Sequence, residues 1–219
     1  ESPRAPAGAP NILFVVWDDV GFGAFDCYGG LIETPTMTRL AKAGLRYTQF
    51  HTTGLGSATR ACLLTGRNAS ANAMACIPEH PTGFPGSNGR IPLENALISE
   101  VLVEQGYSTW AIGKWHLTPD TERHAAGSRR QWPLGRGFER FYGFLAPETS
   151  HWYPLLEQDN QCIAAPARPE DGYHLSVDLA DRALQYIRDA TTAAPEKPWL
   201  LYFAPGCAHA PHHAPEDWI

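Results

Sequence analysis

The sequence has no long apolar run and no excess of positive charge. None of its apolar stretches approaches the ~20 residues that a membrane-spanning helix needs, and its first residues lack the apolar core of a signal peptide. Lysine and arginine together number 17, against 23 aspartate and glutamate residues, so the formal net charge is -6. These absences argue against a membrane span and against nucleic acid as a partner.

Cysteine is scarce, and its spacing matches no metal-binding motif. The five cysteines stand at positions 27, 62, 76, 162 and 207, so any scheme of disulfide pairs leaves one over. This favours buried free thiols. The compartment stays open: a reducing, cytoplasmic one is favoured, with a periplasmic or secreted location as the alternatives.

The chain does contain enough apolar residues for one sizeable core. Of its 219 residues 43% are apolar and 11% aromatic, as in a globular domain. Residues 1–10 are a Pro/Ala-rich lead, which we interpret as what remains after processing. Beyond the lead, apolar runs predict strands at residues 11–16, 45–50, 107–112 and 199–204.

Amphipathic patterns between these strands predict helices. One is expected to begin at Thr34-Pro35 and end before Gly44, one covers residues 94–105, and one is capped by Ser176. Strands that alternate with helices predict an α/β fold, in which a mostly parallel sheet is sandwiched between helices with right-handed crossovers. Residues 118–173 show little periodicity and are expected to be a long irregular excursion over the active face.

The most specific pattern is the stretch from Gly56 to Arg67. A turn-rich lead from residue 51 is expected to become one or two helical turns near Ser57, and the free N–H groups of a helix start attract anions. Arg60 and Arg67 add guanidinium groups that can grip a tetrahedral oxyanion. From the residues alone, a surface turn with solvated arginines explains the stretch equally well. A P-loop matches less well, because no Gly-Lys-Ser/Thr follows.

Two adjacent acids, Asp18 and Asp19, follow the first predicted strand. Ligands of open α/β sheets bind at the carboxyl ends of the strands. Adjacent carboxylates repel each other unless a cation lies beside them, and their oxygens suit Ca²⁺ or Mg²⁺. The alternative is a solvated turn before Gly21, which the residues alone favour.

Basic and titratable residues follow the third and fourth predicted strands. Lys114 and His116 are two positions apart, so on an extended segment both side chains would project to the same side. Three histidines, at positions 209, 212 and 213, follow the last strand, but their spacing is poor for one Zn²⁺ site. Solvated side chains are the ordinary alternative for Lys114 and His116, and we interpret His212 and His213 as neighbours rather than as ligands.

Together these motifs resemble the sulfatase family. Its signature, Cys/Ser-x-Pro/Ala-Ser/Thr-Arg-x-x-x-Leu-Thr-Gly-Arg, is matched from Ala58 to Arg67. The run before Asp18 is similar to the family's first metal-ligand strand, and residues 113–117 and 137–143 are similar to its Gly-Lys-Trp-His-Leu and Gly-Phe-x-x-Phe-x-Gly segments. The resemblance extends from about Asn11 to Trp218, and it implies an α/β domain of the alkaline-phosphatase type.

The resemblance also implies a function, the hydrolysis of a small-molecule or carbohydrate sulfate ester to inorganic sulfate. A formylglycine hydrate at position 56 would be the nucleophile. The implied roles are as follows: Asp18, Asp19 and position 56 bind Ca²⁺ or Mg²⁺; Arg60 holds the hydrate; Lys114 and His209 bind sulfate and protonate the leaving alcohol; Ser150 offers a hydroxyl to sulfate; His116 acts as a base.

Gly56 is the one departure that matters, because it stands where the family has the cysteine or serine that becomes formylglycine. Three explanations compete: the glycine is a formylglycine written with the nearest one-letter code, an engineered inactivating change, or a natural loss of function. A structural alternative is that the backbone at this position needs a glycine with positive φ. Crowded cations and titratable groups are unfavourable without a bound anion, yet the surrounding motifs are intact. We therefore expect formylglycine at position 56, or a replacement of the residue that becomes one.

Family members continue beyond the point that corresponds to Ile219, with a second pair of metal ligands, a further lysine and a smaller C-terminal domain. Here the pair Asp159-Asn160 follows no predicted strand. We expect residues 11–219 to be the N-terminal part of a catalytic domain that needs the rest of the polypeptide and is inactive alone. The alternatives are a phosphate or phosphonate monoester hydrolase, a non-catalytic anion-binding relative, and a structural subunit completed by a second chain.

Overall fold

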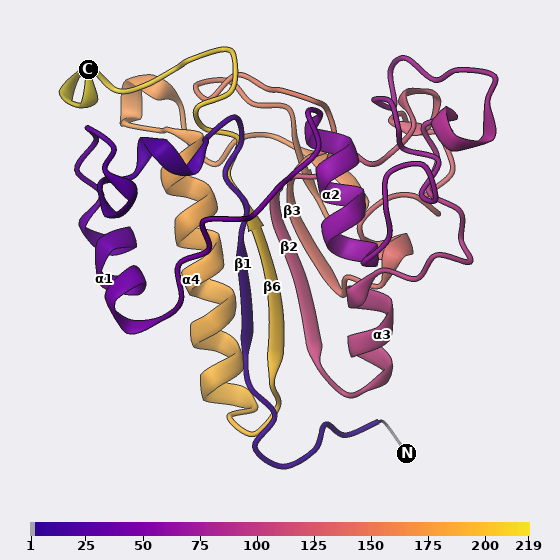
Figure 1. Ribbon diagram of the computed structural model, residues 1–219, viewed down its shortest axis with the longest axis horizontal. Coiled ribbons are helices and arrows are strands. Elements are labelled where there is room, and N and C mark those ends of the chain that lie inside the picture. Colours follow the sequence, from indigo (N-terminus) through magenta and orange to yellow (C-terminus); the bar gives the residue numbers. More distant parts are fainter. Residues whose placement is uncertain (1–2) are drawn as a thin grey trace.

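A six-stranded sheet forms the centre of the molecule in our computed structural model, which describes residues 3–219 (Figure 1). The strand order is β1-β6-β2-β3-β4-β5. The strands are β1 (Ile12–Val15), β2 (Ser108–Lys114), β3 (Arg140–Phe144), β4 (Leu156–Gln158), β5 (Gln161–Ile163) and β6 (Trp199–Ala204). Strands β1, β6, β2 and β3 pair in parallel, and β4 and β5 add an antiparallel edge. The predicted α/β class with a mostly parallel sheet is confirmed.

The two inner strands of the parallel part, β6 and β2, are buried on both faces, which explains their continuous apolar sequences. On one face α2 (Gly56–Thr65) and α3 (Ile98–Glu104) cover the sheet, and their side chains join a core around Trp115. On the other face α4 (Leu175–Ala193), the long orange helix of Figure 1, packs against a second core around Tyr142. The sheet is therefore sandwiched between helices, as predicted.

Three predicted boundaries are wrong. The helix expected over residues 94–105 begins only at Ile98, because Glu100 accepts a hydrogen bond from the Leu97 amide and so defines the helix start. Helix α4 begins at Leu175 and is capped by the ring of His174, which accepts a hydrogen bond from the Ser176 amide. The signature stretch is a full ten-residue helix rather than one or two turns.

The strand predicted at residues 45–50 does not exist. The segment is irregular, and Tyr47 and Phe50 are exposed. Next to it in the chain, α1 (Pro35–Ala43) forms where predicted but has no buried residue, and in Figure 1 it lies to one side of the sheet, beyond β1. A run of strand-forming residues becomes a strand only where another strand pairs with it, and none pairs here.

Three strands lie inside the segment that was predicted to be irregular. Strand β3 pairs with β2 along its whole length, and the hairpin of β4 and β5 continues the sheet. Gly143 is required in β3 because a Cβ atom there would lie 2.0 Å from the carbonyl oxygen of Gly113 in β2. This glycine also weakens the strand pattern, which explains why β3 was missed. No helix in residues 3–219 is long and apolar enough to span a membrane.

Candidate active site

Four of the predicted site residues lie at one edge of the sheet, where the neighbouring parallel strands β1, β6 and β2 end. Asp18 and Asp19 follow β1, Lys114 is the last residue of β2, and His209 follows β6. The order β1-β6-β2 makes these ends adjacent. Helix α2 begins at Gly56 near the same edge, since a side chain there would approach Asp18.

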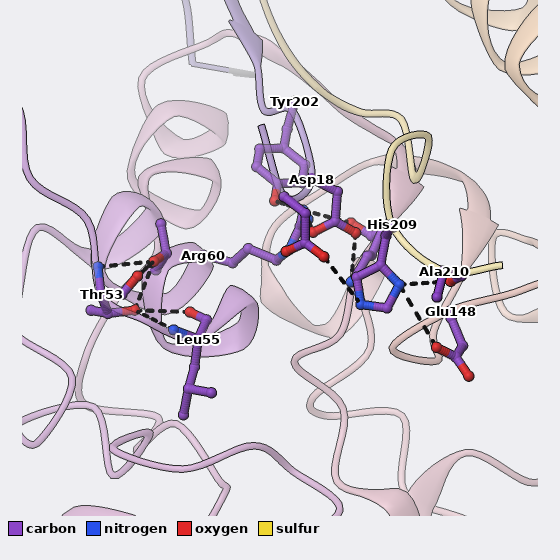
Figure 2. Close-up of polar contacts among 11 residues, drawn as sticks. Asp18, Thr53, Leu55, Arg60, Glu148, Tyr202, His209 and Ala210 are labelled. Carbon is purple, nitrogen blue, oxygen red and sulfur yellow. Dashed lines mark hydrogen bonds and ion pairs between the residues drawn. The ribbon is translucent and has the colours of Figure 1, made fainter. Parts of the chain in front are cut away.

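Asp18 is the centre of a buried cluster of charges (Figure 2). Its Oδ1 lies 3.2 Å from Nη2 of Arg60, and its Oδ2 lies 2.6 Å from Nζ of Lys114. All three side chains are at most 4% exposed. Burial lowers the pKa of the Lys114 ammonium, and the Asp18 carboxylate opposes that shift. One carboxylate thus faces two buried cations. The cluster keeps an excess of positive charge, which suits an anion.

Arg60 connects α2 to β2, to β6 and to the segment that follows β1. Besides its contact with Asp18, its Nη1 donates to the hydroxyl of Tyr202 at 2.9 Å and to the carbonyl oxygen of Lys114 at 3.4 Å. Its third donor, Nε, is buried and has no partner among the described residues. A buried donor without an acceptor is costly, so Nε is available for a group that the chain itself does not provide.

Position 56 has room for a side chain that points at this free donor. A Cβ atom built on Gly56 would lie 3.8 Å from Asp18 Oδ1 and 4.0 Å from Arg60 Nε, with nothing closer. Gly56 is the first residue of α2 and is not among the glycines with positive φ. The explanation that the backbone requires glycine here is therefore wrong.

His209 lies on the exposed side of the cluster. Its Nε2 is 3.9 Å from Asp19 Oδ2, and its Nδ1 is 3.7 Å from Glu148 Oε2 and donates to the carbonyl oxygen of Ala210 at 2.7 Å. Figure 2 shows Glu148 on the side of the ring away from Asp18. The histidine thus stands between two carboxylates, one of which the sequence did not single out.

His116 lies two residues beyond the end of β2. Its φ of 53° shows that the backbone is not extended there, so the condition on which Lys114 and His116 were expected to project to the same side is not met. The Nε2 of His116 lies 3.0 Å from Oε2 of Glu79, and its Nδ1 is buried without a partner among the described residues. Burial lowers the pKa of His116, Glu79 opposes this, and the charges of Lys114 and Arg60 lower it further.

Ser150 forms part of a turn rather than of the charged cluster. Its Oγ accepts hydrogen bonds from the amides of Trp152 and Tyr153. The next residue, His151, is buried against the rings of His174 and His213. Within residues 3–219 these two amides are the hydrogen-bond partners of the Ser150 hydroxyl, and its own proton remains free to donate.

Three non-glycine residues with left-handed backbone stand at this edge of the sheet. They are Asp19 with φ 56°, His116 with φ 53° and Ala208 with φ 72°, and they follow β1, β2 and β6 respectively. Such conformations cost about 1–3 kcal/mol each and concentrate at functional sites. The strain is independent support for a site at this edge.

Asp18 and Asp19 are the right type of ligand for a hard cation, but two residues are too few to complete its coordination. Asp18 and Asp19 offer carboxylate oxygens, the ligands that Ca²⁺ and Mg²⁺ prefer. No group of three or more His, Cys, Asp or Glu side chains in residues 3–219 could hold a metal ion. Asp18 is also paired with two cations, so a metal ion would share its carboxylate with Lys114. The two acids can therefore supply part of a shell of six to eight oxygens.

The sequence did not single out Tyr202, Glu148 or Glu79. A tyrosine in a doubly buried strand was a usable signal, because a buried phenol needs a hydrogen-bond partner. Burial raises the pKa of Tyr202 and the Arg60 guanidinium opposes this, so the hydroxyl can accept from Arg60 as a neutral phenol. The two glutamates lie in irregular segments, where no local pattern marks them.

Known proteins resemble this chain over nearly its whole length. The sequence profile of the sulfatase family matches residues 10–219. Arylsulfatase A of Homo sapiens is 32% identical over 243 residues, which cover 98% of this chain and 44% of that protein. The arylsulfatase of Klebsiella aerogenes is 26% identical over 224 residues, with coverage of 96% and 45%. The chain thus spans less than half the length of these curated relatives.

Solved structures show the same fold. Ps i-CgsB, determined in complex with k-i-k-neocarrahexaose, matches with a TM-score of 0.76 at 26% identity, over 95% of this chain and 47% of that one. A protein of the alkaline phosphatase superfamily from Vibrio parahaemolyticus matches with a TM-score of 0.60 at 18% identity, over 98% of this chain and 45% of that one. The predicted alkaline-phosphatase type of fold is confirmed. By its sequence profile and its fold, this chain belongs to the sulfatase family.

Proposed function

We propose that the protein that contains this chain hydrolyses sulfate esters to an alcohol or phenol and inorganic sulfate. The observation that carries the proposal is the geometry around position 56. Arg60 Nε is a buried donor without a partner among the described residues, and the space before it would be filled by a side chain on residue 56. The cluster around Asp18 also holds more positive than negative charge, as an anionic substrate requires.

Position 56 is proposed to carry formylglycine, whose hydrate would supply one hydroxyl as the nucleophile and a second that later expels sulfate. The start of the ten-residue helix α2 favours negative charge at the same point, because its first N–H groups have no partner within the helix. Arg60 would hold the new side chain through Nε while Nη1 and Nη2 stay bound to Tyr202 and Asp18.

The other side chains have roles that follow from their positions. Lys114 would bind a sulfate oxygen in exchange for part of its contact with Asp18. His209, on the exposed side of the cluster, would protonate the leaving oxygen, and neutral His116 would act as the base in sulfate release. Ser150 would donate its hydroxyl proton to the substrate. A Ca²⁺ or Mg²⁺ ion held by Asp18, Asp19 and the side chain at position 56 would polarise a sulfate oxygen.

We infer a carbohydrate sulfate as one candidate substrate class, because the similar protein Ps i-CgsB was solved with k-i-k-neocarrahexaose. Residues 1–219 alone are proposed to be inactive, since residues 3–219 supply only part of a metal shell. Gly56 itself supports the second candidate, a non-catalytic anion-binding relative, because glycine has no group that could attack sulfur.

The test uses the full-length protein. Peptide sequencing by mass spectrometry across residues 56–60 identifies the species at position 56, and release of inorganic sulfate from an aryl sulfate measures activity beside the matching aryl phosphate. We expect formylglycine and faster turnover of the sulfate. Faster turnover of the phosphate would support the phosphomonoester hydrolase instead. An unmodified, gene-encoded glycine without sulfate release would refute the proposal and support the non-catalytic relative.

A further inference from the structure

A carboxylate outside every recognised motif contacts His116. Glu79 lies in the irregular segment between α2 and α3, 37 positions before the histidine. Its Oε2 is 3.0 Å from Nε2 of His116, and its Oε1 is 3.1 Å from Nη1 of Arg123. The side chains of His116 and Glu79 are 6% and 18% exposed. The glutamate is thus held between a histidine and an arginine with little access to water.

This contact determines which nitrogen of His116 carries the proton. An ionised carboxylate can only accept hydrogen bonds, so Nε2 must be the protonated nitrogen and Nδ1 the basic one. Burial would raise the pKa of Glu79, but the hydrogen bond from His116 and the charge of Arg123 outweigh it and the pKa is lowered. Nδ1 is buried and has no partner within residues 3–219, so its lone pair is free.

We propose that Glu79 is a positioning residue that holds His116 as the Nε2–H tautomer and leaves Nδ1 as the base. The proposal rests on the proposed function, in which His116 is the base of sulfate release. There the O–H bond of the second hydroxyl on residue 56 would break as Nδ1 takes its proton. The electron pair left on that oxygen would form the C=O bond of the aldehyde while the C–O bond to sulfate breaks, so that sulfate leaves with the electrons of that bond. The imidazolium formed has its Nε2–H directed at Glu79, which stays ionised and stabilises the charge. The proton later leaves to solvent.

The rival explanation is that Glu79 only forms an ion pair with Arg123 and thereby holds a loop. Three variants of the full-length protein separate the two. Glu79→Gln keeps the size of the side chain and removes its charge. Arg123→Gln removes the other partner of Glu79, and Glu122→Gln is the matched control, because Glu122 is similarly buried and pairs with Arg90 instead.

Two measurements decide. The ¹⁵N shifts of His116 in histidine-labelled protein give the tautomer of the neutral ring without any turnover. Steady-state hydrolysis of an aryl sulfate gives kcat and KM. We expect Nε2–H in the unchanged protein. For Glu79→Gln we expect kcat to fall by roughly ten- to a hundredfold with little change in KM, the size of loss seen when the carboxylate partner of a metal-bound histidine is replaced. Arg123→Gln and Glu122→Gln should stay within about twofold.

Three results would overturn the proposal: an Nδ1–H tautomer in the unchanged protein, a Glu79→Gln variant with normal kcat, or an equal loss in Arg123→Gln. If Glu79→Gln does not fold, the tautomer of the unchanged protein still decides. A protein that hydrolyses no sulfate ester would refute the proposed function, whereas the tautomer measurement would still test the role of Glu79 separately.

Discussion

Nζ of Lys114 lies 2.6 Å from Oδ2 of Asp18, although the two residues are 96 positions apart in the sequence. Both side chains are at most 4% exposed, and Arg60 contacts the other oxygen of the same carboxylate. The desolvation penalty of such buried charges is offset only while all partners are present. Loss of either side chain should therefore both disrupt the candidate site and lower the free energy of unfolding.

The first prediction contrasts the two adjacent acids. Asp18→Ala leaves two buried cations without their counter-ion and should lower the free energy of unfolding by about 3–5 kcal/mol. Asp19→Ala removes a side chain that is 65% exposed and should change it by less than about 0.5 kcal/mol. Urea unfolding measures both, and equal losses in the two variants would refute the structural assignment.

Both acids should nevertheless matter for metal binding. If they are ligands, either substitution should abolish retention of Ca²⁺ or Mg²⁺ by the full-length protein, although Asp19→Ala leaves its stability intact. Metal analysis after dialysis tests this. A double variant, Asp18→Ala with Asp19→Ala, that retained its metal would refute the assignment.

The second prediction concerns Arg60 and Tyr202. The Arg60 guanidinium contacts Asp18 through Nη2 and Tyr202 through Nη1, and its Nε lies near position 56. The single ammonium group of Arg60→Lys cannot make all three contacts. We expect kcat of the full-length protein to fall by about a hundredfold or more, the usual effect of losing a donor to developing charge. Tyr202→Phe is the matched control: it should cost about 1–3 kcal/mol of stability and leave most of the activity. Kinetics and thermal unfolding of both variants distinguish these outcomes.

The third prediction compares two glycines. Gly56 has helical backbone, and a Cβ atom added to it would make only ordinary van der Waals contacts, so Gly56→Ala should keep the fold or stabilise it by up to about 1 kcal/mol. In Gly113→Ala the new Cβ atom would lie 2.2 Å from the carbonyl oxygen of Ala204, at a φ of 100°. That variant should lose at least about 1–3 kcal/mol. Circular dichroism melting measures both, and similar losses would contradict the space at position 56.

The fourth prediction is a pH dependence caused by Glu157 of β4. Burial raises the pKa of this carboxyl to about 7 from an ordinary value of 4.5, although a backbone N–H of Leu145 and the charge of Arg123 oppose the shift. The unfolded chain loses this proton near pH 4.5 and the folded protein only near pH 7. Glu157 therefore lowers stability as the pH rises between these values, by about 3 kcal/mol at most.

Glu157→Gln should remove this effect, because the amide does not ionise. Relative to the unchanged protein it should be stabilising at pH 8 and nearly neutral at pH 4. Urea unfolding at the two pH values tests this. A stability difference between the variant and the unchanged protein that is the same at both values would show that Glu157 titrates normally.

Much of the fold was determined locally by the sequence. The run at residues 199–204 matches β6, and the run at residues 11–16 contains β1, because a strand that is buried on both faces needs continuous apolar residues. Since parallel strands end at a common edge, the sequence predicted that Asp18 and Lys114 lie at the same edge, but their direct contact depended on the strand order, in which β6 lies between β1 and β2. The signature from Ala58 to Arg67 was sufficient to identify the family.

Only the tertiary structure decided which residues complete the site. Residues 45–50 stay irregular because no strand pairs with them, whereas residues 140–144 form β3 because β2 pairs with them along their whole length. His116 has a left-handed backbone that no sequence pattern indicated, and its contact with Glu79 joins segments without a common motif. The space at Gly56 and the free Nε of Arg60 are likewise properties of packing among the described residues. Distances between side chains far apart in the sequence are set by how the elements pack, and no local pattern encodes them.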